Sequence, residues 1–201
     1  MARYIGPKQR LQRQIGEDLG LKTNALKTAR RLASRPGQHG AKGRRKVSNY
    51  GIQLKEKQKL KYIYGILEKQ LRATYEEASK NPAATGTAML SFLERRLDNV
   101  VYRLGWAPTR AAARQLVNHN HFTLNGKKMN IPSYQVRVGD VLTMKAKTAK
   151  VPVVAATMKE DTKLPAWLQA KNGAASVTKL PVREDITEKV DEQLIVEYYN
   201  R

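Results

Sequence analysis

The stretch "WAPTRAAARQLVNHNHFTLNGKKMN", residues 106–130, changes its hydrophobic period halfway along. After Thr109, a residue type that caps helices, alanine, leucine and valine recur at three- and four-residue spacing, which predicts a short helix over 109–118. The second half consists of two short extended runs around Asn125-Gly126, the residue pair favoured in two-residue hairpin turns. A helix followed directly by a β-hairpin predicts an α+β fold.

Downstream, the alternating pattern continues. Residues 134–145 alternate apolar and polar side chains around a Gly-Asp turn, which predicts further strands and a small antiparallel sheet packed on helices. Residues 146–180 are irregular apart from a plausible strand at 151–155. The segment 190–201 fits a terminal helix with acidic residues in its first turn, and a short strand at 194–196 is the alternative.

Upstream, the sequence is helical and strongly basic. Apolar stripes at three- and four-residue spacing predict one continuous helix over 53–79 and a second over about 87–104. Residues 1–48 show no sustained apolar period beyond short helices near 11–21 and 26–32. We therefore expect an extended basic arm that becomes ordered on its partner.

The charge of the chain favours a nucleic acid as that partner. Thirty-eight Lys and Arg stand against 17 Asp and Glu, a net charge of +21 that repels itself unless an anion neutralises it. A membrane is the other candidate, but no apolar run approaches the ~20 residues that span a bilayer. The N-terminus lacks the apolar stretch of a signal peptide, so a cytoplasmic protein is expected. The absence of cysteine excludes disulfides, iron–sulfur clusters and thiolate zinc sites.

The acidic residues, by contrast, are concentrated at the C-terminus. The last eighteen residues hold six acidic and two basic side chains, and RNA phosphates would repel them. This segment either folds back against the basic helix at 53–79 or contacts a basic neighbouring protein, and both can hold together.

The helix and hairpin predicted within residues 106–130 hold the most specific candidate site. No acidic residue occurs from Ala107 to Gly139, whereas an ordinary charged surface would include some. A cationic helix face beside a cationic hairpin suits the wide minor groove and distorted junctions of RNA. The candidate RNA-binding residues here are Thr109, Arg110, Arg114, Asn118, His119, His121, Asn125, Lys127 and Lys128. A metal site at the two histidines is disfavoured because neither cysteine nor a carboxylate lies nearby in sequence.

A second candidate is the glycine-rich basic stretch "RPGQHGAKGRRK", residues 35–46. It fails the G-x-x-x-x-G-K-[ST] pattern of a nucleotide-binding phosphate loop. A flexible solvated linker is the plain alternative, and a defined conformation on RNA is the interpretation that we prefer, since glycines let backbone N–H groups approach phosphates. The candidates are Gly37, Gln38, His39, Lys42, Arg44, Arg45 and Lys46, joined by Lys55, Lys57 and Lys61 of the long helix. Arg44→Ala and Arg114→Ala are each expected to weaken RNA binding and to make its salt dependence shallower.

Three blocks of the chain resemble one family. The first is "RPGQHGAKGRRKVSNYGIQLKEKQKLKYIYGILEKQLR", the second is "RLDNVVYRLGWAPTRAAARQLVNHNHFTLNGKKMNIPSYQVRVGD", and the third contains "LPVREDI" and "LIVEYYNR". In this order and spacing they resemble the small-subunit ribosomal protein number four family of bacteria and organelles, over almost the whole chain. Many members bind zinc through N-terminal cysteines, but the matching region, about Lys8 to Leu32, has none, so this chain resembles a zinc-free variant.

The resemblance implies a discontinuous helical domain into which an RNA-binding module is inserted. The expected bounds are 1–45 for the arm, 46–91 with 176–201 for the helical domain, and 92–175 for the module with its extension, whose core is about 92–155. It further implies a protein without enzymatic activity, cofactor, metal, small-molecule substrate or membrane contact. Its location would be the small ribosomal subunit in the cytoplasm.

The resemblance also implies partners. The family binds small-subunit ribosomal RNA at a helix junction of the 5′ domain, nucleates assembly of the subunit body, and influences decoding accuracy through its surface with ribosomal protein number five. The candidates for that surface are Tyr50, Gln53, Glu192, Tyr198 and Tyr199. The basic arm would contact messenger RNA where it enters the subunit.

Two other classes of function were weighed against this one. An RNA-modifying enzyme such as a pseudouridine synthase can carry the same small module. It needs a further catalytic domain with an active-site aspartate, for which 201 matched residues leave no room, and no nucleophile elbow, deaminase signature or dinucleotide fingerprint occurs. A free RNA-binding regulator, for example of its own message, is compatible with the ribosomal role.

Overall fold

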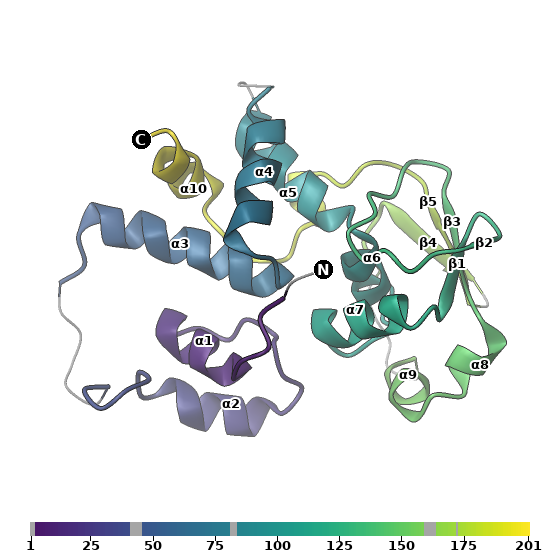
Figure 1. Ribbon diagram of the computed structural model, residues 1–201, viewed down its shortest axis with the longest axis horizontal. Coiled ribbons are helices and arrows are strands. Elements are labelled where there is room, and N and C mark those ends of the chain that lie inside the picture. Colours follow the sequence, from purple (N-terminus) through teal and green to yellow (C-terminus); the bar gives the residue numbers. More distant parts are fainter. Residues whose placement is uncertain (1–2, 41–45, 81–83, 159–163, 172) are drawn as a thin grey trace. The chain divides into compact units, whose positions relative to one another are not determined.

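The computed structural model describes residues 3–40, 46–80, 84–158, 164–171 and 173–201 (Figure 1). The chain forms two compact units. Met1–Gly86 and Lys189–Arg201 make up the helical unit, and Thr87–Glu188 make up the sheet unit. The helical unit is discontinuous, but its bounds differ from the expected 46–91 and 176–201, because the N-terminal segment belongs to the same unit and the chain re-enters it only at residue 189.

The helical unit is built around α3 and α4, where the sequence predicted one helix. Its helices are α1 (Lys8–Ile15), α2 (Ala25–Leu32), α3 (Asn49–Tyr64), α4 (Glu68–Ala78), the start of α5 (Thr85–Glu94) and α10 (Glu192–Tyr199). The prediction of a continuous helix was wrong because Gly65 adopts a left-handed conformation, φ 62°, and ends α3. Apart from its chain neighbours and the backbone of its own helix, no described atom lies within 4 Å of the position that a Cβ at Gly65 would occupy, so the left-handed turn is what favours glycine here.

The N-terminal segment is folded against the rest of the helical unit. α1 packs on α2 and α3, and the apolar side chains of Leu11, Ile15 and Leu19 are buried. The guanidinium group of Arg13 donates hydrogen bonds to the carbonyl oxygens of Ser34 (2.8 Å) and Arg35 (2.8 Å). The described part of residues 1–48 is therefore not an extended arm, although its two short helices lie near the predicted positions.

The sheet unit combines helices with a five-stranded antiparallel sheet of order β2-β1-β3-β5-β4 (Figure 1). The strands are β1 (Phe122–Leu124), β2 (Lys127–Lys128), β3 (Val141–Met144), β4 (Leu168–Lys171) and β5 (Ala174–Val177). The helices are the remainder of α5, α6 (Leu97–Arg103), α7 (Arg110–Asn118), α8 (Ala146–Ala149) and α9 (Pro152–Thr157), with a 3-10 turn at Arg183–Asp185. A core around Trp106, Phe122 and Trp167 joins the helices to the sheet. The predicted α+β class with a small antiparallel sheet is confirmed.

Local signals in the opening stretch hold in the structure. The Thr109 hydroxyl accepts a hydrogen bond from the Ala112 N–H at 3.2 Å and caps α7. Asn125 and Gly126 have φ values of 49° and 76° between β1 and β2, as a two-residue hairpin turn of the primed type requires.

Two of the weaker predictions failed. The predicted strand at 151–155 was wrong, because Pro152 occupies the first turn of a helix, where its missing N–H is not needed. The helix predicted over 87–104 is two helices, α5 and α6, and between them Arg96 forms an isolated bridge with Gln135.

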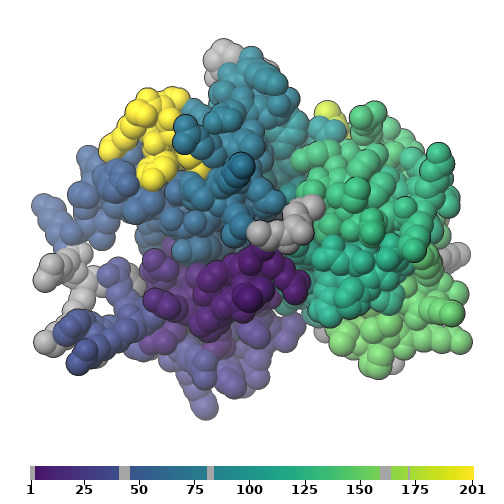
Figure 2. Space-filling model, viewed as in Figure 1, coloured from purple at the N-terminus to yellow at the C-terminus, as the bar shows by residue number. Residues whose placement is uncertain are grey.

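The end of the acidic C-terminal segment, Lys189–Arg201, folds back on the helical unit, one of the two expected arrangements, whereas Glu184, Asp185 and Glu188 belong to the sheet unit. α10 packs along α3, and Figure 2 shows its yellow surface beside the blue surface of that unit. Gln53 donates a hydrogen bond to Glu197 at 2.8 Å, and the Tyr199 hydroxyl donates one to Glu68 at 2.9 Å. The predicted terminal helix is confirmed, and the alternative of a strand at 194–196 is not found.

Candidate nucleic-acid interface

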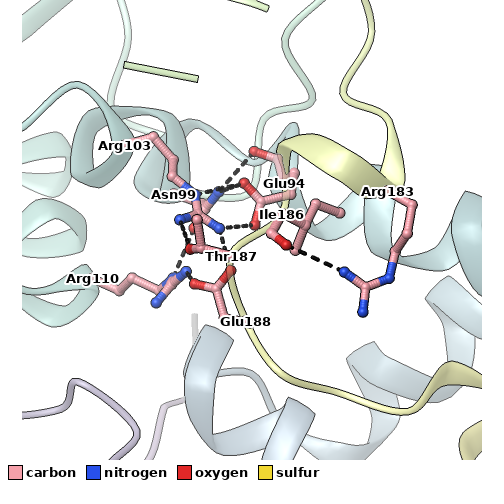
Figure 3. A network of polar contacts seen from close by, with 8 residues as sticks. All are labelled: Glu94, Asn99, Arg103, Arg110, Arg183, Ile186, Thr187 and Glu188. Carbon is pink, nitrogen blue, oxygen red and sulfur yellow. Dashed lines mark hydrogen bonds and ion pairs between the residues drawn. The ribbon is translucent and has the colours of Figure 1, made fainter. Parts of the chain in front are cut away.

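The two arginines of α7 point into the sheet unit. The Nε of Arg110 donates to the Asn99 side-chain oxygen at 2.7 Å, its guanidinium stacks 4.4 Å from the Tyr102 ring centroid, and a terminal nitrogen forms an ion pair with Glu188 (Figure 3). Arg114 is 6% exposed and pairs with Asp98 at 3.1 Å. The structure therefore gives both arginines an internal role in place of the cationic surface expected from their spacing.

Arg110 belongs to a buried network that joins distant segments (Figure 3). Arg103 donates to both carboxylate oxygens of Glu94, at 2.7 and 2.9 Å, and also pairs with Glu188. Asn99 donates to Glu94 at 2.8 Å and accepts from Arg110, so it connects Arg110 to Glu94. Two arginines thus face two carboxylates, and the segment around Glu188 is fixed to α5, α6 and α7.

The protonation of Glu188 follows from this environment. Burial alone would raise the pKa of its carboxyl group, but the positive charges of Arg110 and Arg103 and their hydrogen bonds outweigh burial and lower the pKa. Glu188 is therefore the charged partner of both arginines at neutral pH.

The hairpin, by contrast, presents its cations to solvent. Lys127 and Lys128 form the edge strand β2 and are exposed, as are Asn118 and His119 at the end of α7. Among the described residues, no carboxylate lies within 4 Å of either lysine ammonium. These lysines are available to an anionic partner.

Asn125 is exposed, but its side chain is engaged within the sheet unit. Its amide donates to Asp140 at 2.8 Å, and its oxygen accepts from the Val141 N–H at 2.8 Å. Asp140 in turn accepts from the Arg137 N–H at 2.8 Å. Asn125 holds the hairpin against the next turn, and Thr109 similarly serves as a helix cap.

His121 is half-buried and held by α8. Its Nδ1 lies 2.9 Å from the hydroxyl oxygen of Thr148, whose hydroxyl donates to the His121 carbonyl oxygen at 3.0 Å. The Lys145 N–H donates to the same carbonyl at 3.1 Å, and the Lys145 ammonium donates to the Asn120 carbonyl at 2.6 Å. Burial, His119 and Lys145 lower the pKa of His121.

In the helical unit, the described part of the glycine-rich stretch is exposed. Gly37 adopts φ 98° and Gly40 donates to its carbonyl at 3.1 Å, so Gly37, Gln38 and His39 lie in a tight turn. Lys46 is exposed. Lys42, Arg44 and Arg45 lie outside the described residues.

The three lysines predicted on α3 differ from one another. Lys57 is 4% exposed and pairs with Glu68 at 2.7 Å beneath the Tyr198 ring, while Lys61 pairs with the same carboxylate at 3.2 Å. Burial would raise the pKa of Glu68, but hydrogen bonds from Lys57, Tyr199 and Lys61 outweigh it and lower the pKa. Lys55 pairs with Glu17 at 3.6 Å and keeps 38% of its side chain exposed. Of the three, Lys55 is the most accessible.

The residues proposed for a protein surface differ in their exposure and contacts. Tyr50 is exposed and lies beside Tyr198 and the Arg201 guanidinium, with ring contacts of 5.8 and 5.5 Å. Gln53 and Tyr199 bond to Glu197 and Glu68 inside the helical unit. Glu192 is half-buried on α10, against Gly86.

Several exposed cations were missed by the sequence reasoning. Lys147 and Lys150 are exposed in and after α8, Lys145 is half-buried before it, and Lys27 and Arg30 are exposed on α2. None of these five has a carboxylate partner within 4 Å among the described residues. The repeated lysines in "KAKTAK", residues 145–150, were the available signal, and that segment was interpreted as irregular.

Two kinds of alternative site find no support in the described part of the chain. No group of three or more His, Asp or Glu side chains there is arranged to hold a metal ion. No helix within those residues combines the length and hydropathy needed to cross a membrane.

Fold and site define an α+β protein that has a helical unit and a helix-and-hairpin unit. Within the described part of the chain, several of its exposed basic residues have no acidic partner. Two family models match it: "Ribosomal protein S4/S9 N-terminal domain" over residues 3–94 and "S4 domain" over residues 95–142. Among similar proteins, the "Small ribosomal subunit protein uS4" of Geobacter sulfurreducens is 52% identical over the full length of both chains. The proteins of that name from Chloroflexus aurantiacus and Brevibacillus brevis are each 47% identical, again over both full lengths.

The chain belongs to the uS4 family of small ribosomal subunit proteins. The expected resemblance is thereby confirmed, and with it the class of structural, non-enzymatic proteins. The chain has no cysteine, in agreement with the zinc-free variant expected from its sequence.

Proposed function

We propose that this protein is a structural constituent of the small ribosomal subunit in the cytoplasm, where it binds the subunit's ribosomal RNA directly. The proposal rests on a difference between the arginines and the lysines of the sheet unit. Arg96, Arg103, Arg110 and Arg114 are neutralised internally by carboxylates, whereas the lysines of the hairpin and of α8 lack such partners among the described residues. Names of relatives from three bacterial genera agree with this role.

The proposed RNA surface is assigned residue by residue. On the sheet unit it comprises Asn118, His119, His121, Lys127, Lys128, Lys145, Lys147 and Lys150. On the helical unit it comprises Gln38, His39, Lys46 and Lys55, with Lys27 and Arg30 of α2. Each phosphate neutralised contributes about −0.7 to −0.9 to the slope of log affinity against log salt. Arg110, Arg114, Lys57 and Asn125 are assigned to positioning, because their polar groups are engaged within the protein.

The finer parts of the role rest on family membership. We propose that the RNA site is the helix junction of the 5′ domain, that binding there nucleates assembly of the subunit body, and that the protein contributes to decoding accuracy through ribosomal protein number five. The exposed ring of Tyr50 with the adjacent Arg201 is the described feature that best suits a protein contact, because aromatic and arginine side chains are enriched at interfaces. The basic N-terminal segment would face messenger RNA where it enters the subunit.

The test is binding to a transcript of a bacterial 5′ domain and to an unrelated RNA of equal length, each across a salt series. We expect a preference for the 5′-domain transcript that survives moderate salt. The double variant Lys127→Gln, Lys128→Gln should bind more weakly and with a slope shallower by about 1.5. Lys80→Gln is the control, since Lys80 is exposed but paired with Glu77 at 2.8 Å, and its slope should match the wild type. Equal binding to both RNAs, or an unchanged slope in the double variant, would refute the proposal.

A further inference from the structure

The turn between α7 and β1 holds its histidine in a defined orientation. His121 is anchored twice by Thr148, through its ring and through its carbonyl oxygen, and Thr148 is fully buried. The Asn120 backbone just before it is in the left-handed region, φ 61°, and its carbonyl accepts the Lys145 ammonium. The short segment that directly follows β3, Lys145–Ala149, therefore holds this turn and the His121 ring.

The proton of the Thr148 hydroxyl links the tautomer of this ring to the hydrogen bonds around it. The hydroxyl oxygen lies 3.0 Å from the His121 carbonyl oxygen and 2.9 Å from Nδ1, and the single proton can be donated to only one of them. We take the carbonyl oxygen as its acceptor. The 2.9 Å contact between that hydroxyl oxygen and Nδ1 is then a hydrogen bond only if Nδ1 carries a proton and donates. In this arrangement Nε2 is the unprotonated nitrogen of the neutral ring, and a further proton goes onto Nε2.

The neighbouring groups that act on the pKa of His121 are both basic side chains. His119 from the end of α7 lies with its ring centroid 6.3 Å away, and Lys145 comes from the segment between β3 and α8. Burial, with a smaller contribution from these two neighbours, lowers the pKa of His121, so the ring is neutral in the free protein at neutral pH. No described carboxylate lies within 4 Å of either histidine or of Lys145.

We propose that His121, with Lys145 and His119 beside it, forms a binding point for one RNA phosphate, and that Nε2 of His121 takes up one proton from solvent when the phosphate binds. The incoming negative charge reverses the local balance that keeps the ring neutral, and protonated Nε2 then donates a charge-assisted hydrogen bond to a phosphate oxygen. Thr148 is the positioning residue, because it is fully buried and its hydroxyl oxygen lies 2.9 Å from Nδ1 of the ring. This inference rests on the proposed RNA-binding function and adds that the binding is coupled to pH through one identified atom.

The first test needs no RNA. Long-range proton–nitrogen NMR spectra of the free protein distinguish the two neutral tautomers, and with three histidines in the chain the signals are assigned by single substitutions. We expect the Nδ1–H tautomer at His121, which is the less common one. Thr148→Val should shift it toward the Nε2–H form, whereas His39→Gln should leave it unchanged. An Nε2–H tautomer in the wild type would overturn the inference and leave the proposed function standing.

The second test measures proton uptake on binding. Calorimetric titrations of the 5′-domain transcript, in buffers with different ionisation enthalpies, should show wild type taking up more protons than His121→Gln, by a difference approaching one. The affinity of wild type should correspondingly rise about tenfold more than that of the variant for each pH unit of acidification where the proton is taken up. His39→Gln should behave as wild type. A parallel titration with inorganic phosphate measures whether a free anion, without RNA, causes the same proton uptake.

The outcomes are separable. Tight, selective RNA binding with equal proton uptake in wild type and His121→Gln would overturn the inference alone. Weaker binding of His121→Gln without a change in uptake would likewise overturn it, because the neutral ring would then accept a hydrogen bond from a ribose hydroxyl. Failure of the wild type to prefer the 5′-domain transcript would count against the proposed function itself.

Discussion

Replacing Glu188 by glutamine removes one negative charge from the buried network of the sheet unit and keeps the size of the side chain. Glu188 accepts from Arg103 and Arg110, and the three side chains are between 10% and 13% exposed. Removing one partner of a buried pair costs about 3–5 kcal/mol. Here Arg103 keeps Glu94 and Arg110 keeps Asn99, so we expect the lower end, about 3 kcal/mol.

For a chain of this length, that cost corresponds to a fall in Tm of roughly 6–12 °C. Thermal and urea unfolding, followed by circular dichroism, measure it directly. Glu184→Gln is the matched control, because Glu184 is an exposed carboxylate in the same segment, and it should change stability by less than about 0.5 kcal/mol. If Glu188→Gln and Glu184→Gln unfold within about 1 kcal/mol of each other, the network does not hold this segment and the assignment of Arg110 to positioning fails.

Three further predictions follow from named contacts. Folding lowers the pKa of Glu188, so the stability that its charge contributes is fully present above the pKa of the unfolded state, ~4.3, and is lost as pH falls through the pKa of the folded state. The stability advantage of wild type over Glu188→Gln should therefore shrink below about pH 4. Tyr199→Phe removes the 2.9 Å hydrogen bond to Glu68 and should cost about 1.5–3 kcal/mol in urea unfolding, and an unchanged midpoint would contradict the role of this bond in holding α10. Gly65→Ala should cost about 1–2 kcal/mol from the left-handed backbone alone, and Gly65→Asn should cost less; equal costs would point to a steric cause.

The parts of the fold that the sequence predicted well are those set by neighbours along the chain. Thr109 caps α7 through a group three residues away, and Asn125 and Gly126 form a turn from their own backbone preferences. The residues of α10 show both an acidic first turn and an apolar stripe, so the helix was predictable from local pattern alone. Gly65 itself is a signal for the end of a helix, but the apolar stripe continues across it, and the sequence therefore favoured one continuous helix.

The orientation of the basic side chains was not predictable in the same way. Arg110 meets Glu188 across 78 positions of sequence, and Tyr199 meets Glu68 across 131. Spacing along α7 shows that Arg110 and Arg114 lie near one another, but it does not show whether that face looks toward solvent or toward a carboxylate from a distant segment. Only the fold supplies the partners that turn an apparent RNA-binding face into a buried network.

There is a physical reason why arginines form the buried ion pairs of the sheet unit while lysines lie on its exposed edge. A guanidinium group offers several donors in a fixed plane and is weakly hydrated, so it tolerates burial where it can bond to two carboxylates at once, as Arg103 does with Glu94 and Glu188. An ammonium group is compact and strongly hydrated, which suits the exposed edge formed by Lys127 and Lys128. Using Arg110 on RNA would require breaking its pair with Glu188, at a cost of about 3–5 kcal/mol, whereas a lysine on β2 loses only water. The RNA surface that we propose on the sheet unit therefore leaves the internal network intact.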